Sequence, residues 1–185
     1  KGHEVDPTSL NYKAGDDYRS AARGRSNQPA VFLDSSGRAF TVDAHLLPSA
    51  RSQGEPLTGR FALVAGEIFE HVLMGDDEHR YLFASDAGYG FIGKFADTVS
   101  RNKAGKALLS LPRSSKVMPP PRISNIESDL CLAISNEGRM LNFPLKDLPE
   151  LSKGKGNKII NIPSARSQNR EEYITQLAVV PENAT

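Results

Sequence analysis

Lysine and arginine residues gather in loops along this sequence, and the chemistry open to them is phosphate binding. From Lys94 to Lys116 there are six basic residues and a single acidic residue, Asp97. A second set follows at Lys153, Lys155 and Lys158, next to glycines 154 and 156. Because glycine lets a backbone approach a phosphate closely, such an edge could follow a nucleic-acid backbone without reading its bases. Charge alone is also compatible with solubilising turn residues, so both interpretations stay open.

Acidic residues gather in a different part of the chain, which separates the two signs of charge along the sequence. They form a block of Glu67, Glu70, Asp76, Asp77, Glu78 and Asp86. The formal net charge is only +1, which excludes a uniformly basic nucleic-acid coat but not one basic side. The acidic block also leaves open a rival function, a protein-interaction scaffold that docks through this surface.

No residue set in the sequence has the spacing of a catalytic or metal site. The four histidines form no H-x-x-x-H or H-E-x-x-H motif, and the loop between His71 and His79 fits a solvated connection better than a metal site. Cys131 lies in an apolar run, which predicts a small core residue. We therefore expect no catalysis, no metal and no cofactor in this chain.

Composition and length limit the remaining classes of protein. The chain has 185 residues, of which 38% are hydrophobic, and no stretch approaches the roughly 20 apolar residues that span a bilayer. A single cysteine excludes an intrachain disulfide and favours a reduced compartment. We expect a cytoplasmic piece of a larger protein with no membrane partner, since the chain begins at Lys1 and shows no signal-peptide pattern.

The elements that must position these loops repeat along the chain. Three segments consist of an apolar run, a short polar turn and a second apolar run, which is typical of a β-hairpin. Their turn glycines are Gly37, Gly88 and Gly138, and a second series in the basic loops comprises Gly54, Gly105 and Gly156. A third marker pairs Gly15 with Gly66. All three series have a period of about 51 residues, which predicts a repeat architecture.

The period predicts an all-β fold of stacked four-stranded blades. Because a small sheet cannot bury both faces alone, radial stacking is expected, and about three and a half units indicate an open or partial ring. We predict one domain over residues 1–185, with units at about 14–64, 65–111 and 112–180 and the start of a further unit to 185. Residues 95–100 and 145–151 could each form one helical turn, and residues 164–176 are expected to be an exposed insertion.

Several long strings closely resemble the C-terminal domain found in the A-type subunit of bacterial DNA topoisomerase IV. The strings are Lys1–Asp6, Leu10–Asp16, Pro48–Gly59, Ala84–Phe91, Ser100–Leu108 and Leu151–Pro163. The resemblance covers nearly the whole chain. It implies a β-pinwheel, a propeller-like ring whose blades exchange strands, in a domain that binds double-stranded DNA along a basic outer rim and bends it. The related gyrase subunit carries a Q-R-R-G-G-K-G box that this sequence lacks, which favours modest bending over full wrapping.

The resemblance also implies a larger enzyme around the domain. That enzyme is an ATP-dependent type IIA topoisomerase that decatenates chromosomes and relaxes supercoils. Its catalytic tyrosine, its Mg²⁺ site and its ATPase would lie elsewhere, so none of the five tyrosines here is expected to be the nucleophile. The implied partners are the catalytic core that belongs to the same polypeptide and the B-type subunit of topoisomerase IV, in a nucleoid-associated complex.

The predicted phosphate contacts follow from the basic loops together with this resemblance. The main set is Arg51, Arg101, Lys103, Lys106, Lys153, Lys155 and Lys158, and the secondary set is Arg19, Arg23, Arg25 and Arg60. Salt-dependent binding of a duplex would separate this function from the rival scaffold.

Overall fold

A computed structural model describes residue 6, residues 10–49 and residues 52–181 of the chain. Strands dominate it, and the helices are single turns. In chain order the strands are β1 (Pro29–Asp34), β2 (Arg38–Asp43), β3 (Phe69–Met74), β4 (Arg80–Ser85), β5 (Tyr89–Lys94), β6 (Lys106–Ala107), β7 (Arg122–Ile123), β8 (Leu130–Ser135), β9 (Met140–Pro144), β10 (Asn157–Lys158) and β11 (Ile174–Val180). The α-helices are α1 (Phe95–Thr98) and α2 (Ser164–Gln168), and three 3-10 turns cover Ala44–Leu46, Leu57–Gly59 and Leu145–Asp147.

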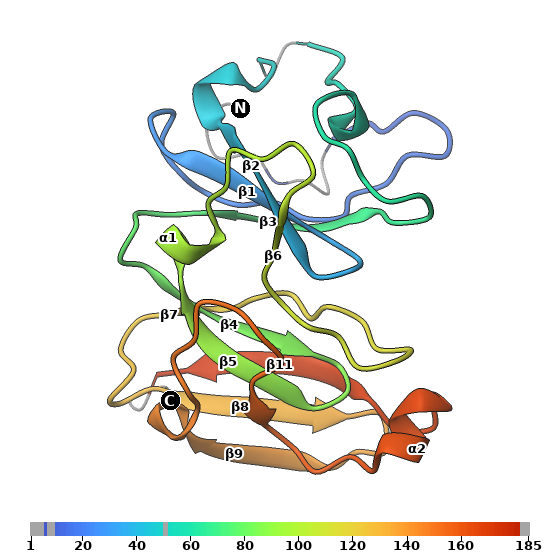
Figure 1. The fold of residues 1–185 in the computed structure, drawn as a ribbon, viewed down its shortest axis with the longest axis vertical. Coiled ribbons are helices and arrows are strands. Elements are labelled where there is room, and N and C mark those ends of the chain that lie inside the picture. Colours follow the sequence, from blue (N-terminus) through green and yellow to red (C-terminus); the bar gives the residue numbers. More distant parts are fainter. Residues whose placement is uncertain (1–5, 7–9, 50–51, 182–185) are drawn as a thin grey trace.

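Three antiparallel hairpins form the centres of three blades, stacked from top to bottom in Figure 1. They are β1–β2, β4–β5 and β8–β9, and each is closed by one of the predicted turn glycines. Gly37, Gly88 and Gly138 have φ values of 83°, 91° and 75°, a left-handed conformation that glycine adopts at no steric cost. The hairpins and the two predicted helical turns, α1 and Leu145–Asp147, are confirmed.

Each hairpin is completed by strands from the following part of the chain. The first sheet has the order β3-β1-β2-β6, the second β10-β5-β4-β7 and the third β11-β8-β9. Strand β6 therefore follows the second hairpin in sequence but pairs with the first, and β10 follows the third hairpin but pairs with the second. The all-β pinwheel with exchanged strands is confirmed. The predicted unit boundaries stay a prediction, and both four-stranded sheets take strands from two of these units.

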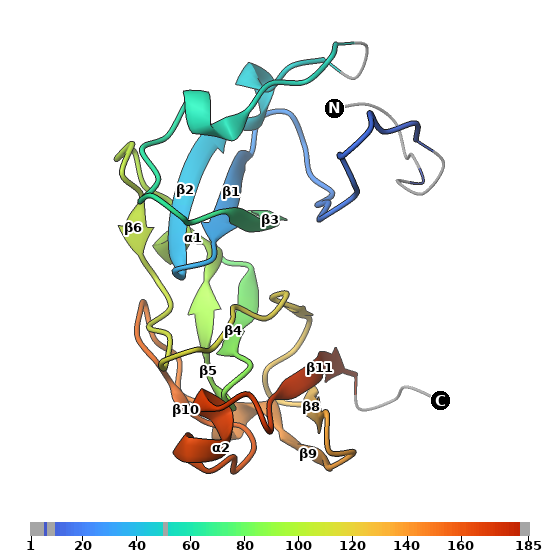
Figure 2. The ribbon, with the colours of Figure 1, turned by 90° about the vertical axis from the view of Figure 1, so that its right-hand side faces the viewer.

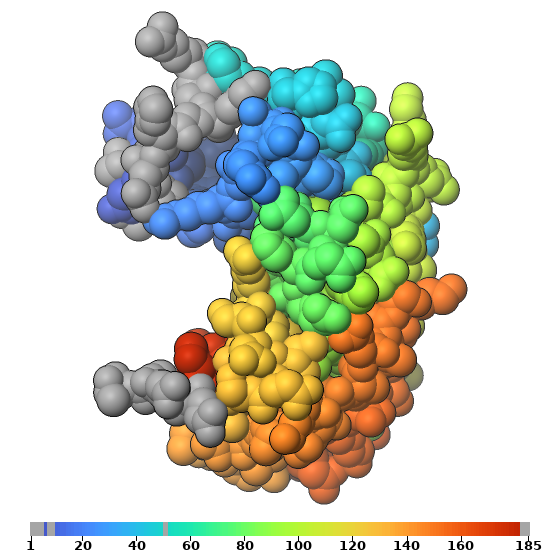
Figure 3. All heavy atoms as spheres, turned by 90° about the vertical axis from the view of Figure 1, so that its left-hand side faces the viewer, coloured from blue at the N-terminus to red at the C-terminus, as the bar shows by residue number. Residues whose placement is uncertain are grey.

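The blades lie along an arc that does not close. Figure 2 shows β6 and β10 on one side of the molecule and β3 and β11 on the other. We call the side with β6 and β10 the convex edge. Figure 3 shows the opposite side as a hollow between the first and third blades. The order of the sheets thus places one exchanged strand of each of the first two blades on the same outer edge.

The blades are held together by the faces of their hairpins. Along β4, alternate side chains point to opposite faces, as in any strand. Tyr81 and Phe83 pack in a core shared with the first blade, and Leu82 and Ala84 pack in a core shared with the third. Cys131 is buried in the second core, as predicted. Burial of both faces of the middle sheet is what makes stacking necessary.

In each blade a pair of hydrogen bonds, which we call the clip, attaches a later segment of the chain to the hairpin. The residue two positions before each turn glycine, Ser35, Asp86 or Asn136, donates its backbone N–H to a carbonyl of the incoming segment. Its side-chain oxygen accepts the backbone N–H of the residue in that same segment, at 3.0, 2.8 and 2.8 Å. This clip recurs in all three blades, although the three side chains differ.

The expected exposed insertion at residues 164–176 is wrong in its second half. Ile174 is buried and begins β11, which pairs with β8 over most of its length. Glu172 has an exposed fraction of 0%. Its carboxylate lies 2.5 Å from the Arg139 guanidinium and 2.9 Å from that of Arg166. The positive charges of two arginines offset the cost of burying this carboxylate. The polar local sequence gives no sign of these contacts, because they depend on the tertiary fold.

Candidate nucleic-acid interface

Two basic loops reach the convex edge because each one ends in an exchanged strand. The first leads into β6, which pairs with β2, and the second leads into β10, which pairs with β5. A Cβ on Gly105 would lie 2.7 Å from the Phe40 ring, and a Cβ on Gly156 would overlap the carbonyl oxygen of Gly90. Only glycine fits such close approaches. The preceding blade therefore fixes the position of each loop.

Four cations of these loops are exposed and have neither an acidic partner nor a side-chain hydrogen bond among the described residues. They are Arg101, Lys103, Lys153 and Lys155. The Lys155 ammonium lies 4.3 Å from the centroid of the Tyr89 ring, an arrangement favoured by the negative face of the aromatic ring. We call these four residues the edge cations. Their full charge is available to an incoming anion.

Lys106 and Lys158 lie in the same two strands but are partly engaged with the protein. The Lys106 ammonium donates a hydrogen bond of 2.5 Å to the carbonyl oxygen of Asp97. The Lys158 ammonium donates to the Asn161 side chain at 2.8 Å and remains exposed. Lys106 is half-buried, so part of its role is to fix the loop on α1.

The secondary arginines lie in other surroundings. Arg19 pairs with Glu70 and Arg25 with Asp76, in each case across 51 residues of sequence, and Arg60 pairs with Glu55. Carboxylates next to these three guanidinium groups offset their charge. Arg23 is exposed, and Arg51 lies outside the described residues.

Most carboxylates of the acidic block form ion pairs within the molecule. Besides the pairs of Glu70 and Asp76, Glu78 pairs with Lys94, and nearly buried Asp86 pairs with Arg170 at 2.7 Å. Hydrogen bonds from Gln28 and then from Arg25 hold the pKa of Asp76 below its ordinary value. A surface whose carboxylates already have partners offers little uncompensated charge to a docking protein.

Two residues that support the loops were missed by the sequence analysis. The Arg38 guanidinium donates to the carbonyl oxygens of Ala104 and Gly105, at 3.0 and 2.9 Å, and so holds the first loop on β2. Tyr89 supports Lys155 in the second blade. Both follow a turn glycine directly, so their recurrence at one repeat position is the signal that could have identified them.

Neither a membrane span nor a metal cluster is found in the described part of the chain. No helix there is long and apolar enough to cross a bilayer. The described residues also contain no group of three or more His, Cys, Asp or Glu side chains that could hold a metal ion.

Comparison with known proteins agrees with this geometry. A family model described as the DNA gyrase C-terminal domain, beta-propeller, matches residues 129–181. This part of the chain thus has the class of a propeller-like C-terminal domain of gyrase-type subunits. The solved structure of the E. coli ParC C-terminal domain is 56% identical, with a TM-score of 0.89, and the match covers 98% of this chain and 74% of that one. The chain belongs to the family of C-terminal domains of ParC, the A-type subunit of DNA topoisomerase IV.

Curated relatives extend this match over the whole chain. The A-type subunits of DNA topoisomerase 4 from Escherichia coli K12 and from Pseudomonas aeruginosa are each 56% identical over 185 residues, which is 100% of this chain. The chain spans 24% of the length of each of these relatives. A solved C-terminal domain of DNA topoisomerase IV with 14% identity and a TM-score of 0.69, covering 84% of this chain and 48% of that one, shares the fold.

Proposed function

We propose that this chain is a non-catalytic DNA-binding domain that holds a duplex along its convex edge and bends it. The observation that carries the proposal is the set of four edge cations, exposed and without acidic partners in the described chain, on loops that end at β6 and β10. Lysine and arginine at a surface edge bind phosphates of any sequence. An edge that curves over successive blades favours a bent duplex over a straight one, because bending adds phosphate contacts.

In the complete ParC polypeptide, we propose that the domain positions a DNA segment for ATP-dependent decatenation and supercoil relaxation. Strand cleavage, ATP and Mg²⁺ would belong to the catalytic core and to the B-type subunit, and the domain would bind DNA without them. This assignment follows the family of the chain and the exposed basic edge. The acidic block supports no competing assignment, since most of its carboxylates face basic side chains of the same chain.

The direct test is a salt titration of duplex binding by the 185-residue chain. In the edge variant, all four edge cations are replaced by glutamine. Each phosphate contact contributes about 0.9 to the slope of log K against log salt, so the edge variant should lose about 3 to 4 units of slope. A duplex of ~35 base pairs with a donor and an acceptor dye at its ends should also show increased energy transfer with the native chain only.

A matched control removes the same amount of charge from other places. It replaces four ion-paired cations by glutamine: Arg19, Arg25, Arg60 and Lys94. This variant should keep most of the native slope, and circular dichroism should confirm that both variants are folded. Equal losses in the two variants would show that only net charge matters. Native binding by the edge variant would exclude the convex edge as the DNA surface.

A further inference from the structure

A pocket of about 260 Å³ lies where the second and third blades meet, next to the basic edge. It is bounded by the turn of the second hairpin, by residues 110–113, by the loop before β10 and by α2. Its volume is below the roughly 300–1,000 Å³ of drug-sized ligand sites. Tyr89 and Lys155 line it as well as supporting the edge, so the pocket is continuous with the proposed DNA path.

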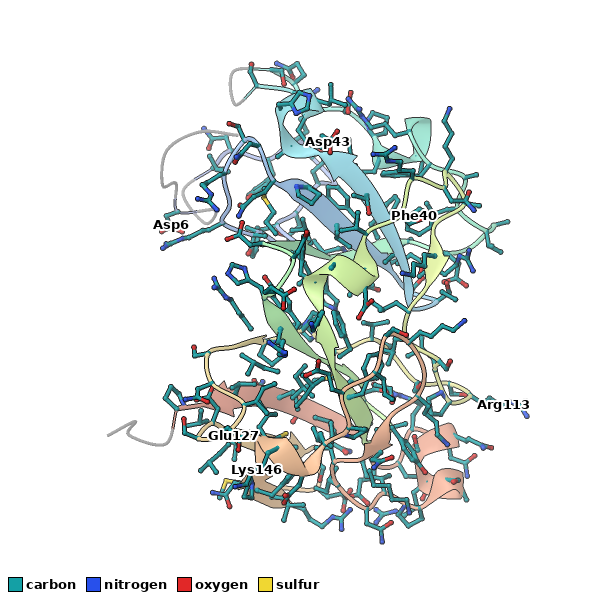
Figure 4. The ribbon with its side chains drawn as sticks, turned by 60° about the vertical axis from the view of Figure 1, so that its left-hand side comes forward. Asp6, Phe40, Asp43, Arg113, Glu127 and Lys146 are labelled. Atoms are coloured by element: carbon teal, nitrogen blue, oxygen red, sulfur yellow. The ribbon has the colours of Figure 1, made fainter. Side chains whose placement is uncertain are left out.

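The lining of this pocket suits an anion. It has two cations, Arg113 and Lys155, four hydroxyl-bearing residues, one side-chain amide and no acidic residue, beside four apolar residues. Arg113 is exposed, forms no ion pair with a described residue and projects away from the body of the molecule in Figure 4. Ser167 of α2 is 3% exposed and forms part of the pocket wall.

The walls of the pocket are held in place by a dedicated contact. The Arg170 guanidinium, just after α2, donates to the Asp86 carboxylate at 2.7 Å and to the Ser114 carbonyl oxygen at 3.3 Å. It thereby ties α2 to the second hairpin and to the segment that carries Arg113. Ser114 and Arg170 have φ values of 63° and 58°, the only positive values among described residues other than glycine. Such strained residues cluster at functional sites.

We propose that this pocket seats one phosphate of the DNA backbone and extends the DNA path from β10 to α2. The Lys155 ammonium and the Arg113 guanidinium, which extends from the mouth of the pocket, would neutralise the phosphate. This inference rests on the proposed function and adds one residue to it, Arg113. A fixed seat between two blades would set the point at which the duplex changes direction.

The test measures duplex affinity of single variants across a salt series. Arg113→Gln removes one phosphate contact, so the slope should fall by about 0.9 and the affinity at 0.1 M salt by about eightfold. Lys146→Gln is the control. Lys146 is exposed beyond the pocket lining and is labelled in Figure 4 on the side away from Arg113. Lys146→Gln should leave the salt slope and the duplex affinity unchanged. Equal losses in the two variants would overturn the proposal of a phosphate site in the pocket.

A second measurement distinguishes a DNA phosphate from a free anion. Native duplex affinity of Arg113→Gln would overturn the inference. A melting temperature raised by inorganic phosphate over chloride at equal ionic strength, with Arg113→Gln binding DNA normally, would indicate a free-anion site and overturn it as well. If the native chain binds no duplex at all, the proposed function itself fails.

Discussion

Alanine at two glycines that share one repeat position tests the strand exchange that builds the convex edge. Gly54 and Gly156 have φ values of 75° and 78°, in the left-handed region. Alanine at either position should therefore destabilise the folded chain by about 1–2 kcal/mol through backbone strain. Their surroundings differ. A Cβ on Gly54 would meet no atom of the described residues within 4 Å, whereas one on Gly156 would overlap the backbone carbonyl oxygen of Gly90.

The extra cost at Gly156 follows from the atoms that would have to move. The contact is with backbone of β5, so the loop must separate from that strand and weaken the β10–β5 pairing, including the 2.8 Å bond from the Ile159 N–H to the Gly88 carbonyl oxygen. Losing one or two such bonds adds about 1–3 kcal/mol. We therefore expect Gly54→Ala to lower the free energy of unfolding by about 1–2 kcal/mol and Gly156→Ala by about 2–5 kcal/mol.

Urea unfolding followed by circular dichroism measures this difference. The midpoint should shift two to three times further for Gly156→Ala than for Gly54→Ala, about the ratio of the two costs. Gly156→Ala should also weaken duplex binding, because the edge cations beside it lose their fixed position. Equal shifts in the two variants would refute the reasoning, since left-handed strain alone would then explain both and the loop would not lie on β5.

Three further predictions concern buried groups. Replacing Glu172 by glutamine should cost about 2–4 kcal/mol in urea unfolding, because two arginines face its buried carboxylate, whereas the same change at exposed Glu171 should cost under ~1 kcal/mol. Burial lowers the pKa of His71, so the unfolded chain takes up its proton first and stability should fall as the pH drops below about 6.5; His71→Gln should remove this dependence. Burial raises the pKa of the Cys131 thiol to about 12, so iodoacetamide at pH 8 should modify it only after unfolding in urea.

The local parts of this fold could be predicted from the sequence. Alternating apolar runs around glycine at a fixed spacing indicate hairpins, and all three hairpins are present. Strand pairing between units is a long-range property with no local signal. Nothing in the Lys106–Ala107 string shows that it pairs with β2 rather than with its neighbour in sequence.

The candidate site could be predicted only as a set of charges. In the sequence, Arg25 and Lys103 are both basic residues of polar segments, with nothing to tell them apart. In the structure, Arg25 pairs with Asp76, 51 residues away, whereas Lys103 contacts no carboxylate in the described chain. Arg113 stood within the basic stretch, but the pocket beside it is formed by α2, more than fifty residues later. Selecting among cations therefore needs the tertiary contacts.

A tethered DNA-cleaving probe tests the central claim, that duplex DNA lies on the convex edge, most directly. An iron–EDTA group would be attached to Ser152→Cys, an exposed site next to Lys153, or to Glu127→Cys, which lies on the side away from Arg113 in Figure 4. The native thiol of Cys131 is buried and should not compete for the reagent. We predict that the probe at position 152 cleaves bound duplex DNA and that the probe at position 127 does not. Cleavage from position 127 but not from position 152 would contradict the account.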